Sequence, residues 1–249
     1  MPSVPSLAVI ACAVLEDETR HFAAGLPHVR EVVIMPQNLH NEPARLQREL
    51  QAAISRLEQR SDIGAIALVY GLCSRGVEGL HHERCPLVMA RAHDCVTLFL
   101  GSKERYAEYL REHPGTYWYT PGWIKCHIPP GPDRTAYQRQ VYSAKYEADD
   151  VEYLMELEKE WIANYTQATF VGLGVGETAK DMAYTRRCAE CLNWDFAQVE
   201  GDATLLRDLI EGKWDEQRFL VVPPRKFIRL TADDRVVEAV GFEGRTPNA

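Results

Sequence analysis

The sequence lacks the long apolar runs and the basic segments that mark several classes of protein. None of its hydrophobic stretches reaches the ~20 residues that a membrane-spanning helix needs. There is no block of Lys and Arg, and a formal net charge of −8 disfavours a protein that follows the phosphates of nucleic acid. No basic stretch precedes the first apolar run, so we expect a first strand there and not a signal peptide. These absences predict a cytoplasmic protein that binds neither a membrane nor nucleic acid.

Familiar catalytic motifs are also missing. The chain has no Walker loop, no G-x-S-x-G elbow and no D-x-H-x-x-G corrinoid fingerprint. Its seven cysteines are an odd number in 249 residues, which argues against the disulfide framework of a small secreted protein. The cysteines are therefore buried apolar residues, metal ligands or a reactive thiolate, and their place in the fold has to decide between these roles.

The first hundred residues alternate between strand and helix. Four runs, at 6–11, 31–35, 63–70 and 86–90, have the length of strands and are apolar on both faces, as in a parallel sheet covered by helices. Residues 43–57 carry apolar side chains with a period of 3.6 residues, which predicts a helix. Strands joined by helices predict an α/β fold with a Rossmann-like, doubly wound parallel sheet and flanking helices.

The pattern changes after a predicted helix at 102–112, where Ser102 is the expected N-cap. A second α/β half then repeats the order of strand, glycine-bearing turn and helix, and 226–230 with 236–241 are candidates for an edge hairpin. We expect three parts: an N-terminal Rossmann-like half at 1–112, an aromatic loop with a long helical connection at 113–165, and a similar C-terminal half at 166–249.

Polar residues gather where the first four strands end. In chain order, these strands are followed by Cys12, then Asn38 and His40, then Cys73, and finally Arg91, His93, Asp94 and Cys95. Open α/β sheets bind ligands beyond the carboxyl ends of their strands, and neighbouring strands lie only ~4.8 Å apart. Side chains from three such strands can therefore converge on one ion or one small cluster.

The cysteines of this edge predict a metal site. Cys12, Cys73 and Cys95 are soft ligands that select zinc or an iron–sulfur centre over magnesium or calcium, and His93 is the expected imidazole ligand. Zinc with three protein ligands keeps an open position for catalysis, and a [4Fe–4S] cluster on three cysteines leaves one iron free for substrate. Buried inert thiols and a metal-free reactive thiolate remain alternatives. The candidate catalytic residues are His93, Asp94, His40 and Arg91.

A glycine-rich turn in the second half is a separate candidate for cofactor binding. Gly172, Gly174 and Gly176 follow one predicted strand and open a helix, and Glu200 ends the next strand. Nucleotide-binding folds hold phosphate and ribose with glycines and an acid in such places. The last glycine falls one residue short of G-x-G-x-x-G, and glycines at such turns also serve packing alone.

Four segments resemble an uncharacterised family of bacterial and archaeal proteins, a domain of unknown function. They are Leu39-His-Asn-Glu-Pro43, Tyr70-Gly-Leu-Cys-Ser-Arg-Gly76, the block from Arg91 to Ser102, and Thr120-Pro-Gly-Trp123. Members of that family are often encoded near corrinoid-dependent methyltransferase systems, so the resemblance implies one-carbon or methyl-group metabolism.

Together these observations predict a metal-dependent enzyme that activates a small substrate, such as a thiol, for methyl transfer. A corrinoid protein or a methyltransferase is the partner that the resemblance suggests. The alternatives are a [4Fe–4S] lyase or desulfidase and a non-catalytic accessory protein that binds a metal or corrinoid for a methyltransferase system.

Overall fold

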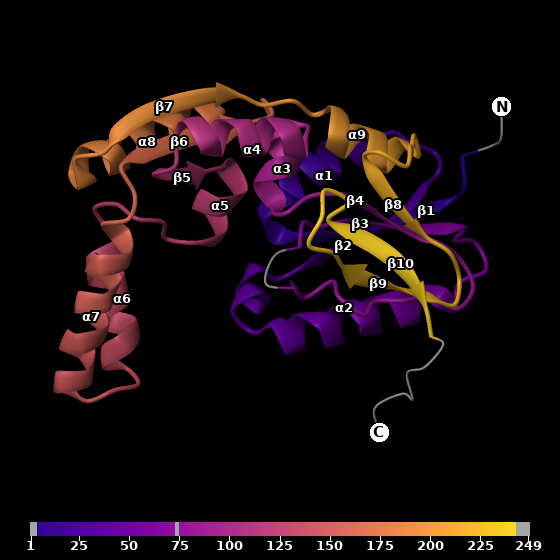
Figure 1. The fold of residues 1–249 in the computed structure, drawn as a ribbon, viewed down its shortest axis with the longest axis horizontal. Helices are drawn as coiled ribbons and strands as arrows, with labels where there is room; N and C mark the ends of the chain where they lie inside the picture. Colours follow the sequence, from indigo (N-terminus) through magenta and orange to yellow (C-terminus); the bar gives the residue numbers. More distant parts are fainter. Residues whose placement is uncertain (1–3, 73–74, 243–249) are drawn as a thin grey trace. The chain divides into compact units, whose positions relative to one another are not determined.

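A computed structural model describes residues 4–72 and 75–242, and the chain folds into two compact units (Figure 1). The first unit comprises the chain up to Arg105 together with the chain from Asp202 onward, and the second runs from Tyr106 to Gly201. The helix α4 (Lys103–Glu112) begins in the first unit and ends in the second. This division differs from the expected boundaries at 112 and 165, because the last part of the chain returns to the sheet of the first unit.

The first unit is built on a five-stranded sheet. Its strands are β1 (Leu7–Cys12), β2 (Val29–Met35), β3 (Ala65–Val69), β4 (Leu87–Ala90) and β8 (Phe219–Val222), in the order β2-β1-β3-β4-β8. The first four are parallel, and β8 is antiparallel to β4. Every residue of β1, β3 and β4 is buried, as runs that are apolar on both faces predict.

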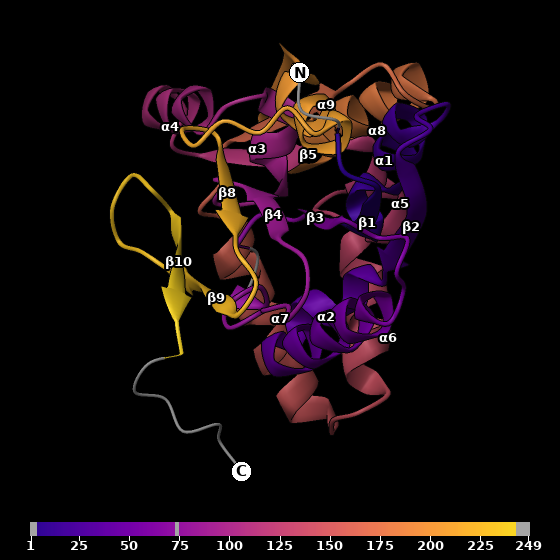
Figure 2. The ribbon, with the colours of Figure 1, turned by 90° about the vertical axis from the view of Figure 1, so that its right-hand side faces the viewer.

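Helices cover both faces of this sheet, which confirms the predicted α/β fold. They are α1 (Glu16–Ala23), α2 (Pro43–Glu58), α3 (Cys95–Leu100) and α9 (Thr204–Glu211), with short 3₁₀ turns η1 (Ala13–Leu15) and η2 (Gln37–Asn41). Figure 2 shows α2 on one face and α1, α3 and α9 on the other. The side chains that α2 buries against the sheet are those of the predicted stripe, Leu46, Leu50, Ile54 and Leu57.

A hairpin of β9 (Lys226–Leu230) and β10 (Val237–Gly241) follows β8 and forms a separate two-stranded sheet. The hairpin predicted from the sequence is therefore confirmed. The short bridge between His81 and Phe227 joins its first strand to the loop before β4.

The second unit contains a three-stranded parallel sheet. Its strands are β5 (Thr116–Tyr119), β6 (Gln167–Gly172) and β7 (Asp195–Glu200), and its further helices are α5 (Pro121–Cys126), α6 (Arg134–Ser143), α7 (Ala148–Ile162) and α8 (Thr178–Leu192). Its core contains Tyr119, Ala168, Phe170 and Cys188. The expected aromatic loop thus holds a strand and a helix, and the expected long helical connection consists of two helices.

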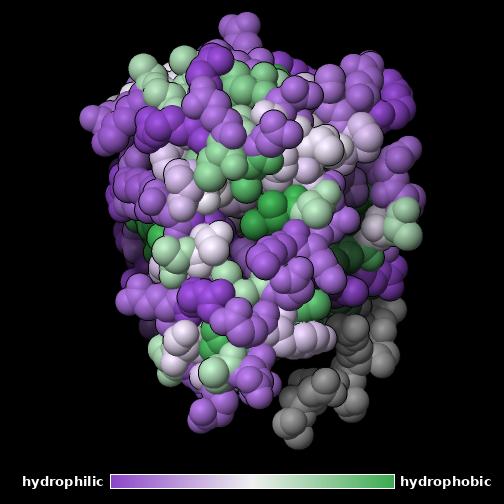
Figure 3. Space-filling model, turned by 90° about the vertical axis from the view of Figure 1, so that its left-hand side faces the viewer, coloured by the Kyte–Doolittle hydropathy of each residue, from purple (hydrophilic) through white to green (hydrophobic). Residues whose placement is uncertain are grey.

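Among the residues that the structure describes, no helix is long and apolar enough to cross a bilayer. The face drawn in Figure 3 is mostly hydrophilic, and its hydrophobic residues lie in small separate areas.

Candidate functional site

The strand order places the predicted site at a topological switch point. From β1 the chain moves to β2 on one side and then to β3 on the other, so the connections leave the carboxyl ends of β1 and β3 in opposite directions. Doubly wound sheets bind their ligands in the crevice at that point. Cys12 is the last residue of β1. After β3, the first of the two described ranges ends at Leu72. Cys73, the next predicted ligand, lies outside the described residues.

Three sequence-predicted residues meet at this edge: Cys12, Cys95 and His40. They come from the end of β1, the first residue of α3 and the η2 turn after β2. The Cys12 sulfur accepts hydrogen bonds from the Cys95 thiol, from the His40 ring and from the backbone N–H of Val14. Residues far apart in the sequence therefore form one polar cluster inside an apolar sheet.

These donors make Cys12 acidic. The hydrogen bond from Cys95 has the largest effect on its pKa, followed by burial, which acts in the opposite direction. The hydrogen bonds from His40 and from the backbone of Val14 come next, and then the charge of His40. The net result lowers the pKa of Cys12 from 9.0 to about 5. Because Cys12 is fully buried and Cys95 is 8% exposed, the thiolate is enclosed by protein.

The local sequence fixes Cys95 at the start of α3. Asp94 is the N-cap of this helix, and its carboxylate accepts a hydrogen bond from the backbone N–H of Thr97 at 3.1 Å. The chain that follows β3 lies directly against this segment, since the amide of Leu72 donates to the carbonyls of Ala92 and His93. The predicted catalytic residue Asp94 thus has a capping role.

Gly71 and Gly76 hold the chain on either side of positions 73 and 74. A Cβ atom on Gly71 would lie 2.4 Å from the backbone of Asp94, and one on Gly76 would lie 2.4 Å from the side chain of Leu46 in α2. Only glycine allows these approaches. Gly71 therefore lies against the segment of Asp94, and Gly76 lies against α2.

Two other predicted residues of this edge, His93 and Arg91, are not hydrogen-bond partners of Cys12. His93 is exposed, so His40 and not His93 is the imidazole beside Cys12. Arg91 donates to the carbonyls of Glu216, Arg235 and Val237, and so holds the segments around β8 and β10. Which histidine lies beside Cys12 depends on the 3₁₀ turn η2, which carries His40. This turn is too short to leave a hydrophobic periodicity in the sequence.

One further buried group at this edge is not among the residues predicted from the sequence. Glu18 lies in the first turn of α1, just beyond the carboxyl end of β1, and is fully buried. The run Glu16-Asp-Glu18 was the available signal, but three adjacent acids do not reveal which of them faces inward. Glu18 therefore adds a buried carboxyl group to the structure at this end of β1.

The glycine-rich turn of the second unit has the backbone that its sequence predicts. Gly174 and Gly176 adopt φ values of 74° and 77°, and no atom lies within 4 Å of the place that a Cβ would take at either. Gly172 ends β6 and Glu200 ends β7 at the same edge of the sheet. Backbone conformation accounts for two of the glycines, and cofactor binding at this turn stays a prediction.

The donor chemistry at Cys12 suits a soft metal. Two thiols and an imidazole are the ligands that zinc and iron–sulfur centres prefer. Within 4–72 and 75–242, no three His, Cys, Asp or Glu side chains are arranged around one ion position. The predicted set of three cysteines extends beyond those ranges, because it includes Cys73.

Comparison with known proteins gives a family and no activity. The profile of a family described as "Protein of unknown function (DUF1638)" matches residues 34–210, a range that includes His40, Cys73 and Cys95. No curated protein and no solved structure matches the chain.

Proposed function

Because the chain belongs to the DUF1638 family of proteins of unknown function, we propose its activity from its own residues: a zinc-dependent enzyme that activates a small thiol for methyl transfer. The observation that carries this proposal is the buried Cys12 sulfur, which accepts hydrogen bonds from Cys95 and His40 at the switch point of the sheet. An enclosed sulfur is better suited to bind a metal than to attack a substrate directly.

The three cysteines Cys12, Cys73 and Cys95 are the proposed zinc ligands, which leaves the fourth position for the substrate. His40 acts as a positioning residue, because it donates to the Cys12 sulfur in the way that outer hydrogen bonds orient metal ligands. His93 is not needed in this arrangement, since its side chain is exposed.

Bound zinc would lower the pKa of a coordinated substrate thiol and so present it as a thiolate near neutral pH. The substrate sulfur would then attack the methyl carbon of a donor, the bond between that carbon and its leaving group would break, and the leaving group would depart with the electron pair. The thiol proton passes to solvent. We propose a methyl group as the group transferred, and a corrinoid protein or a methyltransferase as the partner. Both proposals rest on the resemblance of the sequence motifs to the family described above.

The same cysteines support a second candidate, a [4Fe–4S] lyase or desulfidase, because three thiolates also hold a cluster with one free iron. A non-catalytic metal or corrinoid carrier is less well supported. A carrier has to release its cargo, whereas Cys12 and Cys95 are both buried.

Anaerobic purification followed by metal analysis and an absorption spectrum separates these candidates. We expect about one colourless zinc per chain, lost in Cys12→Ser and Cys95→Ser and retained in His93→Gln, which replaces an exposed side chain as the matched control. About four irons with a broad band near 400 nm would favour the cluster. Absence of both metals after reconstitution would refute either form of the proposal.

Zinc-loaded protein should also accelerate the reaction of 2-mercaptoethanol with methyl iodide at pH 6, where the free thiol is almost fully protonated. The rate should fall to the uncatalysed value in Cys95→Ser. A zinc-loaded protein that gives no acceleration would contradict thiol activation while leaving the metal site in place.

A further inference from the structure

A large cavity of about 840 Å³ lies in the first unit, on the β8 side of the sheet. Its wall comes from the start of α4, the segment before β8, β8 itself and the turn between β9 and β10. This volume lies within the range of ligand-binding pockets, ~300–1,000 Å³. Arg91, which leaves the carboxyl end of β4, faces this cavity and is not used in the function proposed above.

Arg91 is a rigid cation with unused donors. Its Nε donates to the carbonyl of Glu216 at 3.0 Å, and its Nη1 donates to the carbonyls of Arg235 at 2.7 Å and Val237 at 2.5 Å. Among the residues that the structure describes, no acceptor lies at its Nη2 and no carboxylate lies within ion-pair distance. Burial lowers the pKa of Arg91, a change that a bound anion would offset.

The backbone next to Arg91 is strained. Val236 is fully buried and adopts a φ of 66°, which a β-branched residue rarely does. The two carbonyls on either side of it, those of Arg235 and Val237, are the ones that reach the same nitrogen of Arg91. Strain that the surrounding structure maintains is concentrated at binding and active sites, and here it serves to fix a guanidinium group.

Two apolar surfaces complete the cavity. Trp214 is anchored by the hydrogen bond from its Nε1 to the carbonyl of Leu209 at 2.8 Å, and Val221 of β8 is 41% exposed. An exposed valine within a strand and a fixed indole offer contact to an apolar ligand body.

The charges around the cavity favour a ligand with a single negative charge. Two further cations line it, but Lys103 lies 3.5 Å from Glu104, and Arg235 is paired with Asp233 and Glu238. The cavity is lined by as many carboxylates as cations. These carboxylates would repel a dianionic ligand more strongly than a monoanionic one.

We propose that this cavity binds a small organic monocarboxylate, with its carboxylate on the Nη2 group of Arg91 and its apolar body against Trp214 and Val221. This binding site is independent of the metal site and of the reaction proposed for it.

Benzoate is a suitable probe, and Trp214 reports on it directly. Trp214 is the only tryptophan of the first unit, since Trp118, Trp123, Trp161 and Trp194 all lie in the second. In the full-length protein labelled with 5-fluorotryptophan, Trp214→Phe identifies its ¹⁹F resonance. We expect benzoate to shift that resonance alone, with saturation and a dissociation constant of about 10 mM or tighter.

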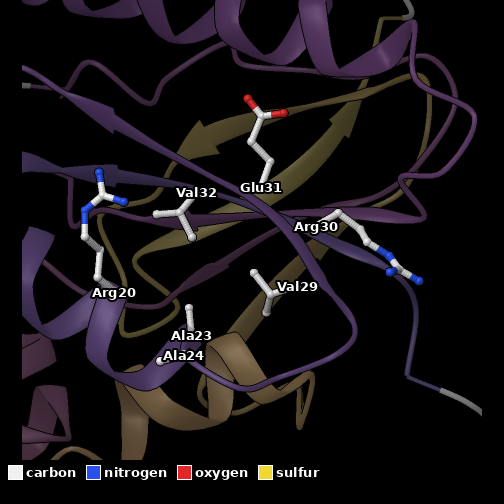
Figure 4. Close-up of a pocket in the computed structure, with 7 residues that line it drawn as sticks. All are labelled: Arg20, Ala23, Ala24, Val29, Arg30, Glu31 and Val32. Carbon is white, nitrogen blue, oxygen red and sulfur yellow. The ribbon is translucent and has the colours of Figure 1, made fainter.

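Neutral benzamide and dianionic phenyl phosphate should each bind at least about tenfold more weakly than benzoate. Val221→Phe places a larger side chain in the cavity, keeps Arg91 unchanged in the sequence, and should weaken benzoate binding about tenfold or more. The matched control is Val32→Phe in a separate pocket of about 350 Å³ between α1 and β2 (Figure 4), and it should leave the affinity unchanged.

Three results would overturn the proposal. The first is an unchanged Trp214 resonance at saturating benzoate, and the second is an equal shift of all five resonances, which indicates non-specific binding. The third is equal affinity for benzamide, because the guanidinium would then have no part in recognition.

Discussion

Replacing Cys95 in the metal-free protein tests how Cys12 becomes acidic. The Cys95 thiol supplies the largest stabilisation of the Cys12 thiolate, so Cys95→Ala should raise the pKa of Cys12 from its value of about 5. A hydrogen bond to a charged group contributes about 1.5–3 kcal/mol, and one pKa unit corresponds to about 1.4 kcal/mol. The expected rise is therefore about one to two pH units. Cys95→Ser keeps a donor at the same position and should change the pKa of Cys12 by less than about one unit.

Labelling with [3-¹³C]cysteine gives one resonance for each of the seven cysteines, and Cys12→Ser assigns that of Cys12. Its chemical shift, followed from pH 3 to 10, yields the pKa in the wild type and in both Cys95 variants. The wild-type resonance should titrate near pH 5.

The pH dependence of the unfolding free energy gives an independent check of the Cys12 pKa. Its direction follows from the lowering of that pKa in the folded protein. The ordinary pKa of Cys12 is 9.0 and its folded value is about 5, so its contribution to stability is complete above pH 9 and is lost as the pH falls through 5. Between these limits the difference in unfolding free energy between wild type and Cys12→Ser should change by about 1.4 kcal/mol per pH unit. Titration of Cys12 near pH 9, or identical titrations of Cys95→Ala and Cys95→Ser, would refute the reasoning and leave buried inert thiols as the interpretation.

Three further predictions concern the structure around the sites. Gly71→Ala forces a Cβ to within 2.4 Å of backbone and should lower the unfolding free energy by several kcal/mol in urea, whereas Gly241→Ala, with nothing within 4 Å, should change it by less than about 1 kcal/mol. Asp94→Ala should destabilise the first unit by about 1 kcal/mol, because α3 loses its N-cap. Asp94→Asn keeps a capping side chain and should retain both the stability and the bound metal. Loss of the metal in Asp94→Asn would show that Asp94 has a role beyond capping. Burial, with a smaller effect of the nearby Arg134 charge, lowers the pKa of His127 to about 4, so the second unit should lose stability as the pH falls from 6.5 through 4. An NMR titration of His127 near 6.5 would contradict this.

The fold of the first unit was predictable where burial left a local pattern. Runs that are apolar on both faces became β1, β3 and β4, and the stripe from Leu46 to Leu57 became the buried face of α2. The return of β8 to the sheet was not predictable, because its antiparallel pairing with β4 joins segments more than a hundred residues apart. Such pairing has no local signature in the sequence.

The prolines and glycines of the aromatic segment predict a loop. Local signals for α5 were nonetheless present: Pro121 occupies the first turn, and the Thr120 hydroxyl accepts from the backbone N–H of Trp123 at 3.1 Å. The strand β5 before it spans only Thr116–Tyr119, too short for a period of two to stand out.

The candidate site was predictable from topology but not in its details. The rule that strand ends meet at one edge predicted correctly that Cys12 and Cys95 lie together. It could not choose between His40 and His93, because that choice depends on a 3₁₀ turn and on which side chain remains exposed. The same rule placed Arg91 at this edge, directly after β4, but it could not show that the guanidinium bonds the backbone around β8 and β10.

Zinc K-edge X-ray absorption of the anaerobically purified protein tests the central claim most directly. A site made by Cys12, Cys73 and Cys95 should show three sulfur ligands near 2.3 Å and one lighter ligand near 2.0 Å. Addition of 2-mercaptoethanol should raise the count to four sulfurs, as the substrate thiol takes the open position. A spectrum with fewer than three sulfurs, or one that the added thiol leaves unchanged, would contradict a catalytic site on these three cysteines.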